Sequence, residues 1–169
     1  MKVLESDRLV LRQFSSEDAG FILELLNEPS FIQNIGDRNV RSIEGAKLYI
    51  KNGPVTSYAR HGFGLYLVEL KETGQAIGMC GLIKRDTLDD VDIGYAFLPK
   101  FWSRGYAVEA ALAVKQYARD VAGLHRIVAI TDPQNAGSIR VLEKIGMKFE
   151  KMVKLSEDDI ELKLFAVDL

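Results

Sequence analysis

The stretch from residue 91 to residue 145 changes periodicity in a way that limits the folds open to this chain. Val91 to Leu98 alternates as a strand does, Tyr106 to about Asp120 has helical spacing, and Arg126 to Thr131 is again strand-like. A second helix follows from Asn135 to Ile145. Two strands joined by a helix lie parallel with a right-handed crossover, so this segment predicts a parallel pair inside a sheet.

The flanking segments predict antiparallel neighbours, which make the sheet mixed. A short turn containing Gly74 joins two apolar runs and indicates a hairpin. We therefore expect an α/β fold with a single mixed, twisted sheet of about seven strands and about four helices. The remaining expected strands are Ser6–Phe14, Phe63–Leu70, Ala76–Lys84, Met147–Leu155 and Ile160–Val167; the remaining helices run from Ser15 to Pro29 and from Ser42 to about Tyr58, with residues 30–41 irregular.

Composition limits the class of protein without stating its function. The 169 residues are the length of one domain, so we expect a single domain over residues 1–169. A net charge of −2 gives no basic footprint for nucleic acid, and the single cysteine cannot form an internal disulfide or a thiolate metal cluster. No apolar run approaches the ~20 residues that a membrane span needs, and the first residues lack the features of a signal peptide. We expect a cytoplasmic protein that binds no membrane, nucleic acid or metal.

The loop before Tyr106 has the features of a phosphate-binding turn. Gly105 lets the backbone approach a ligand without a Cβ, and the small Ala107 keeps the next amide open. The first N–H groups of a helix have no partner inside the helix, and the helix dipole favours an anion there. Glycine turns before helices are common, so this loop alone is weak evidence. The motifs G-x-x-x-x-G-K-[ST] and G-x-G-x-x-G before a helix are absent, which argues against nucleotide triphosphatases and dinucleotide-dependent oxidoreductases.

The helix after Thr131 begins with two polar residues. Asn135 is a suitable N-cap, and Gly146 suits the left-handed position that ends such a helix. Asn135 and Ser138 follow the carboxyl end of a strand, where open α/β sheets bind ligands. A capped amphipathic helix explains the rest of this segment but not this polar pair.

Together these segments resemble the GNAT N-acetyltransferase superfamily and, within it, the branch of the ribosomal-protein N-terminal acetyltransferases. The resemblance covers nearly the whole chain and implies splayed central parallel strands and acetyl-CoA as cosubstrate. The family's cradle, [QR]-x-x-G-x-[GA], is matched at Gly105 and Ala107, with Trp102 in place of Gln or Arg. The residues that carry the resemblance are 7–12, 92–95 and 102–110, and Asn135 with Ser138, Lys144 and Gly146.

The resemblance implies a set of coenzyme contacts. Cradle amides would hold the coenzyme A pyrophosphate, the end of the preceding strand would pair with the pantetheine arm, and the asparagine would bond to that arm. The residues so implied are Phe97, Leu98, Arg104, Gly105, Tyr106, Ala107, Val108, Asn135 and Ser138.

The resemblance also implies direct acetyl transfer to a primary amine. Many members have a tyrosine acid where this chain has Leu142, so Ser138 is expected instead, either as the acid or only as a ligand contact. Asp92 is the expected base, weighed equally against an exposed residue in an acidic run. The Leu98 N–H is expected to stabilise the oxyanion.

Other polar and aromatic residues have simpler interpretations. Glu109 complements the helix dipole, and Tyr95 belongs with most neighbouring aromatic residues in the sheet core. Trp102 or Phe101 is a candidate for the lining of the acceptor tunnel. Cys80 is read as a small core residue, so no cysteinyl intermediate is expected.

Two alternatives stay open at this point. One is a non-catalytic acyl-CoA-binding sensor, and the other is an acyltransferase with a different acyl group or acceptor. The acceptor amine, whether a protein N-terminus, a lysine or a small molecule, has no motif of its own, although net acidity is compatible with a cation. A homodimer is the default expectation for a small enzyme.

Overall fold

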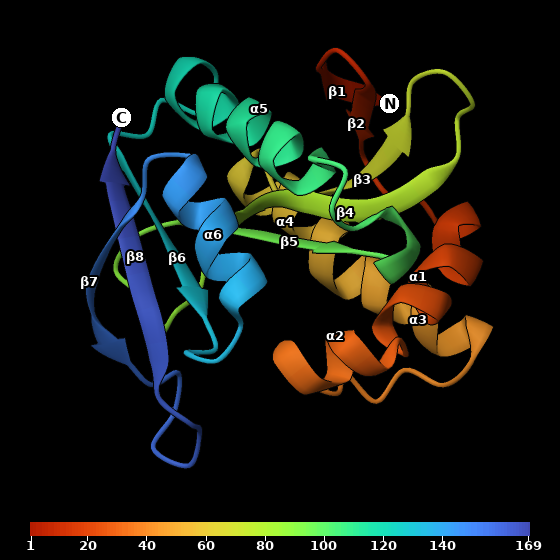
Figure 1. Ribbon diagram of the computed structural model, residues 1–169. Coiled ribbons are helices and arrows are strands. Elements are labelled where there is room, and N and C mark those ends of the chain that lie inside the picture. The colour runs from red at the N-terminus through yellow and green to blue at the C-terminus, as the bar shows by residue number, and fades with distance from the viewer.

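The computed structural model describes residues 1–169 as one eight-stranded sheet with helices on both faces (Figure 1). The strand order is β1-β2-β3-β4-β5-β6-β8-β7. Every neighbouring pair is antiparallel except β5 and β6, which are parallel as the sequence predicts. The strands are β1 (Lys2–Glu5), β2 (Leu9–Arg12), β3 (Leu65–Leu70), β4 (Ala76–Ile83), β5 (Asp92–Phe97), β6 (Arg126–Thr131), β7 (Lys148–Val153) and β8 (Leu162–Asp168).

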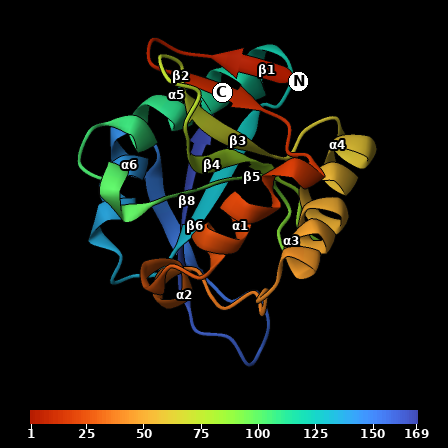
Figure 2. The ribbon, with the colours of Figure 1, turned by 90° about the vertical axis from the view of Figure 1, so that its right-hand side faces the viewer.

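Six α-helices and three short helical turns connect the strands. Figure 2 shows α5 and α6 on one side of the sheet and α1 and α3 on the other. No helix is both long enough and apolar enough to cross a membrane. The helices are α1 (Ala19–Leu26), α2 (Pro29–Asn34), α3 (Ile43–Ile50), α4 (Thr56–His61), α5 (Tyr106–Asp120) and α6 (Ala136–Lys144); the turns are η1 (Ser16–Asp18), η2 (Lys51–Val55) and η3 (Pro99–Phe101).

The centre of the core is β4, whose six inner residues are all buried. Its glycines let neighbouring strands come close: a Cβ on Gly81 would lie 2.0 Å from the carbonyl oxygen of Gly64. On one face α5 packs closely because its inward residues are small, with Ala110, Ala111 and Ala118 completely buried. The dense packing of β4, β5 and α5 holds the edge of the parallel pair in place.

The parallel pair is joined at one register position only. Asp92 pairs with Val128, and the Val128 N–H donates to the Val91 carbonyl at 3.0 Å. No register pair links β5 to β6 beyond this point, so the two strands diverge toward their carboxyl ends. The expected splayed α/β sheet is therefore confirmed.

Three details differ from the sequence predictions. The sheet has eight strands, because Lys2–Glu5 forms an additional edge strand against β2. Residues 30–41 are not wholly irregular, since Pro29 does not stop a helix but occupies the first turn of α2, a position where its missing N–H costs nothing. The helix from Ser42 is divided by the π-helical turn η2, which holds Pro54, and it continues to His61 before ending at left-handed Gly62.

Candidate functional site

The diverging ends of β5 and β6 open into a cavity of about 1110 Å³. Its walls come from β5, the loop before α5, the first turns of α5 and α6, the α2 region and the loop between β7 and β8. Most of the residues predicted for the coenzyme, and both predicted catalytic residues, line this cavity, whereas Leu98 and Arg104 do not. The lining residues from those predictions are Asp92, Phe97, Gly105, Tyr106, Ala107, Val108, Asn135 and Ser138.

The loop before α5 presents a row of unpartnered amides. Gly105 is the N-cap with a φ of +83°, a left-handed conformation that favours glycine. The first main-chain bond of the helix runs from Glu109 N–H to the Gly105 carbonyl at 3.0 Å. The amides of residues 104–108 donate to no group of the protein. Five consecutive free N–H groups at the positive end of a helix dipole form a ready site for an anion.

The backbone of β5 alternates in direction, and this decides which groups face the gap. The Leu98 N–H donates to the Ile77 carbonyl at 3.0 Å, which directs Leu98 toward β4. In an antiparallel pair the adjacent residue points its N–H and C=O the other way, so Phe97 and Tyr95 direct theirs toward β6 and the gap. The Phe97 carbonyl accepts the indole N–H of Trp102 at 2.9 Å, which agrees with this direction.

This alternation corrects the expectation for Leu98. Its N–H is already bonded to β4, and its carbonyl accepts the Phe101 N–H at 2.9 Å. Its side chain is buried away from the cavity. Leu98 therefore has no free amide for an oxyanion, and the main-chain donor at this end of β5 is the Phe97 N–H.

The start of α6 places the two predicted polar residues on the cavity wall. Asn135 caps the helix, and its side-chain oxygen accepts the Ser138 N–H at 3.2 Å. The Asn135 side-chain nitrogen donates to no protein group, which leaves it free for a ligand carbonyl. Gly146 has a φ of +92°, as the sequence predicts for the residue after this helix.

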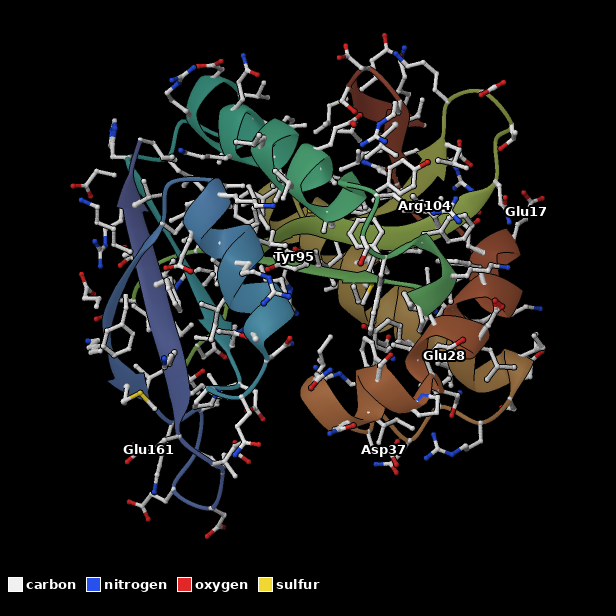
Figure 3. The ribbon with its side chains drawn as sticks, in the orientation of Figure 1. Glu17, Glu28, Asp37, Tyr95, Arg104 and Glu161 are labelled. Atoms are coloured by element: carbon white, nitrogen blue, oxygen red, sulfur yellow. The ribbon has the colours of Figure 1, made fainter.

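Tyr95, which the sequence analysis assigned to the core, contacts the candidate acid. Its side chain points from β5 toward α6 (Figure 3), and its hydroxyl lies 2.9 Å from Ser138 Oγ and 3.1 Å from the Ser138 carbonyl oxygen. Burial raises the pKa of Tyr95 to about 12, against the opposing effect of the Ser138 hydrogen bond. Tyr95 therefore keeps its proton at neutral pH and acts as a hydrogen-bond donor. The sequence does contain a signal for this position: side chains alternate along a strand, so Tyr95 must lie on the same face of β5 as Phe97, which is predicted to contact the coenzyme.

Asp92 is buried and ion-paired, not exposed in an acidic run. Only 1% of the residue is exposed, and Arg85 Nε lies 3.0 Å from its carboxylate. Burial raises the pKa of Asp92, although Arg85 opposes the shift. Because side chains alternate along a strand, Asp92 lies on the face of β5 opposite to Tyr95 and Ser138. The two predicted catalytic residues thus approach the cavity from opposite faces of the sheet.

The remaining chemistry-bearing residues are placed as follows. Leu142 is fully buried, and the thiol of Cys80 is buried with its pKa raised by desolvation. No group of three or more His, Cys, Asp or Glu side chains is placed to hold a metal ion. Trp102 is about half exposed and lines the cavity.

The fold is that of solved acetyltransferases. The model of the acetyltransferase (GNAT) domain matches residues 8–148, so the chain belongs to the GNAT acetyltransferase family. It is accordingly an acetyl-CoA-dependent acyltransferase.

Similar proteins extend over almost the whole chain. The uncharacterized N-acetyltransferase YoaA of Bacillus subtilis is 30% identical over 154 residues, covering 90% of this chain and 86% of YoaA. An acetyltransferase from Agrobacterium tumefaciens has the same fold with a TM-score of 0.84 and 23% identity, covering 99% of this chain and 94% of its own. The ribosomal L7/L12 acetyltransferase RimL, solved with coenzyme A, has a TM-score of 0.81 at 18% identity, covering 100% and 98%. The structural neighbours thus include ribosomal-protein acetyltransferases.

Proposed function

We propose that residues 1–169 act as a single domain that moves the acetyl group from acetyl-CoA directly to a primary amine, with both substrates bound together. The observation that carries this proposal is the row of five free amides beside the divergence of β5 and β6. The amides of residues 104–108 hold the coenzyme pyrophosphate, which needs little help from basic side chains. This suits a chain whose net charge is −2.

The pantetheine arm occupies the gap between the two strands. The main-chain groups of Tyr95 and the carbonyl of Phe97 face this gap without a strand partner, so an extended arm can bond to them as an added strand would. Asn135 supplies its free side-chain nitrogen from the opposite wall. The acetyl group then lies between the strand end and the start of α6.

The two faces of β5 divide the proton chemistry. The amine enters from the face of Asp92, which takes its proton, directly or through water, before the nitrogen attacks the thioester carbon. The Phe97 N–H, the free main-chain donor at this end of β5, stabilises the oxyanion. As the intermediate collapses, the carbon–sulfur bond breaks, the sulfur leaves with the electron pair, and the nitrogen gives up its extra proton to water. Ser138 hydrogen-bonds to that thiolate from the other face, and its proton can pass to the sulfur and be restored from water.

The acceptor end of the cavity favours a cationic molecule. Glu28, Asp158 and Asp159 line it from the α2 side and from the β7–β8 loop, and none of them forms an ion pair (Figure 3 labels Glu28). Arg38 is the only basic residue of the α2 region and the β7–β8 loop that lines the cavity, and it has no carboxylate partner. An ammonium group is attracted to such an entrance before it loses its proton.

Calorimetry with coenzyme A tests the cradle. Wild-type protein should bind, and Gly105→Glu should abolish binding because a side chain at a φ of +83° strains the loop and brings a negative charge beside the amide row. Gly74→Glu is the matched control, since Gly74 also has a positive φ (+74°) but lies in the β3–β4 turn, away from the cavity. Absence of wild-type binding at millimolar coenzyme, or full binding by Gly105→Glu, would overturn the proposal.

The acceptor is identified by thiol release from acetyl-CoA with a panel of amines and peptides. Steady release with an amine establishes catalysis and excludes a coenzyme sensor. Release with a different acyl thioester, and none with acetyl-CoA, would contradict acetyl transfer. Peptides with a free N-terminus, lysine peptides and polyamines separate the three acceptor classes.

A further inference from the structure

The N-terminal segment of the chain is tied to the amide row through Arg8 and Glu109. These residues are 101 positions apart, yet the guanidinium Nε of Arg8 lies 2.7 Å from the Glu109 carboxylate. Arg8 precedes β2, and Glu109 is in the first turn of α5. The contact therefore joins the turn between β1 and β2 to the helix whose start forms the cradle.

Glu109 is fully engaged by this segment. Its carboxylate accepts hydrogen bonds from the Ser6 hydroxyl and from both the backbone N–H and the side chain of Arg8, and its side chain is only 17% exposed. Burial raises its pKa, but the bonds from Ser6 and Arg8 outweigh burial and lower the pKa overall. The helix dipole alone, which the sequence suggested, does not account for this set of partners.

A second nitrogen of the Arg8 guanidinium orients the cradle itself. Arg8 Nη1 donates to the Arg104 carbonyl at 3.0 Å, and the guanidinium lies 4.4 Å from the centre of the Tyr106 ring. In a trans peptide the carbonyl and the following N–H point in opposite directions. Because Arg8 holds the Arg104 carbonyl on its own side, the Gly105 N–H is turned away from Arg8, and Gly105 itself lines the cavity.

We propose that Arg8 is a positioning residue for the coenzyme cradle. It aims the Gly105 amide through the Arg104 carbonyl, and it neutralises Glu109, whose charge would otherwise repel the phosphates one helical turn away. Arg8 does not line the cavity, so it acts through other groups and not as a ligand. This inference rests on the proposed role of residues 104–108 in binding the pyrophosphate.

The two effects of Arg8 can be separated by a set of variants. Arg8→Ala removes both the hydrogen bond to the Arg104 carbonyl and the positive charge that neutralises Glu109. Arg8→Ala combined with Glu109→Gln restores neutrality but not the contact with Arg104, and Arg8→Lys keeps the charge while losing the forked geometry. Arg126→Ala is the matched control, because Arg126 forms a network with Asp90 and Glu150 outside the cavity.

The measurements are the coenzyme A dissociation constant by calorimetry, the KM for acetyl-CoA, kcat, and the thermal midpoint of the empty protein. We expect Arg8→Ala to raise the dissociation constant and the KM about tenfold or more, with kcat within about twofold of wild type. The double variant should bind coenzyme A about threefold more tightly than Arg8→Ala. The dissociation constant of Arg8→Lys should lie between those of wild type and Arg8→Ala. Arg126→Ala should bind coenzyme as wild type does.

Several results would overturn the inference. One is a coenzyme affinity of Arg8→Ala equal to that of wild type. Another is a loss of kcat and affinity that is proportional to the drop in thermal midpoint and is equally large in Arg126→Ala. If Arg8→Ala does not fold, the decision rests on Arg8→Lys, whose wild-type affinity would then count against the inference. Wild-type protein that fails to bind coenzyme A contradicts the proposed function itself, which is a distinct result.

Discussion

The hydroxyl of Tyr95 lies 2.9 Å from the hydroxyl of Ser138 and 3.1 Å from its carbonyl oxygen. The carbonyl can only accept, whereas either hydroxyl can donate to the other. When Tyr95 donates to the Ser138 carbonyl, the serine hydroxyl donates to Tyr95; when Tyr95 donates to Ser138 Oγ instead, the serine proton can point into the cavity. Tyr95 thereby sets the direction in which Ser138 can donate, which makes it a positioning residue for the leaving thiolate.

Replacing Tyr95 with phenylalanine should lower kcat about tenfold, the value of one hydrogen bond of about 1.4 kcal/mol in the transition state. The KM for acetyl-CoA should stay within about twofold, because the ring and its packing remain. Ser138→Ala should lower kcat at least as much, and adding Tyr95→Phe to it should cost little more. Two independent, multiplicative losses in steady-state kinetics would disprove the coupling.

Asp92→Asn should lower kcat about 100-fold, within the usual contribution of a general base. Arg85→Gln is the informative companion, since it removes the ion pair but keeps the carboxylate. A base role predicts a far smaller loss for Arg85→Gln at saturating amine. Equal losses in the two variants would mean that the pair serves only to hold the strand end.

The stability of the chain should depend on acid through Asp18. Its carboxylate accepts from both terminal nitrogens of Arg12 and from the Ser15 N–H. Burial raises its pKa, but these bonds prevail and lower the pKa below the ordinary 3.8. The stabilisation is therefore complete above pH 3.8 and is lost as the pH falls through the lower, folded-state pKa. Asp18→Asn should lose about 2 kcal/mol of unfolding free energy at pH 7, and denaturant titrations should show the gap to wild type narrowing below about pH 4. A gap independent of pH would refute the assignment.

A methyl group at Gly81 should destabilise the sheet by about 3 kcal/mol or more. The added carbon would lie 2.0 Å from the Gly64 carbonyl oxygen and 2.7 Å from the Leu65 Cα, and these backbone atoms cannot move aside as a flexible side chain could. Gly20→Ala is the contrast: Gly20 is in α1 with open space around it, so alanine should add about 0.5 kcal/mol through helix propensity. Thermal or denaturant unfolding of both variants measures the difference, and similar stabilities would be inconsistent with the packing described.

Trp102 is the only tryptophan and provides a direct signal for binding. Its indole N–H is bonded to Phe97, on the strand that the pantetheine arm would follow, and about half of the side chain is exposed. Coenzyme A should change its emission with the dissociation constant that calorimetry gives. Trp102→Phe should abolish the signal without abolishing binding. Unchanged emission in a solution that binds by calorimetry would place the arm elsewhere.

The sequence predicts the parallel pair, the hairpin and the amide row because each follows from local patterns: alternation, a helix start and a glycine. It misses β1, because four residues with charged ends have no clear period and gain their structure from pairing with β2. It misplaces Leu98 by one residue, because the direction of each backbone group depends on the register with β4, which no local pattern records.

The two side-chain pairs that connect distant segments were also beyond local patterns. Glu109 has a sufficient local explanation in the helix dipole, and only the fold brings Arg8 to it. Tyr95 fits the apolar pattern of a buried strand, and its contact with Ser138 depends on how α6 packs. Burial of Asp92 likewise follows from tertiary packing, against an acidic neighbourhood that suggests exposure.

An anion site built from main-chain amides imposes few demands on the identities of its residues. Every residue except proline has an N–H, so the row at 104–108 persists through most substitutions, and left-handed Gly105 is its most restricted position. Such a site leaves most of the surrounding sequence free to diverge. This freedom accords with solved structures that share 18–23% of their residues with this chain and keep its fold at TM-scores of 0.81 to 0.84.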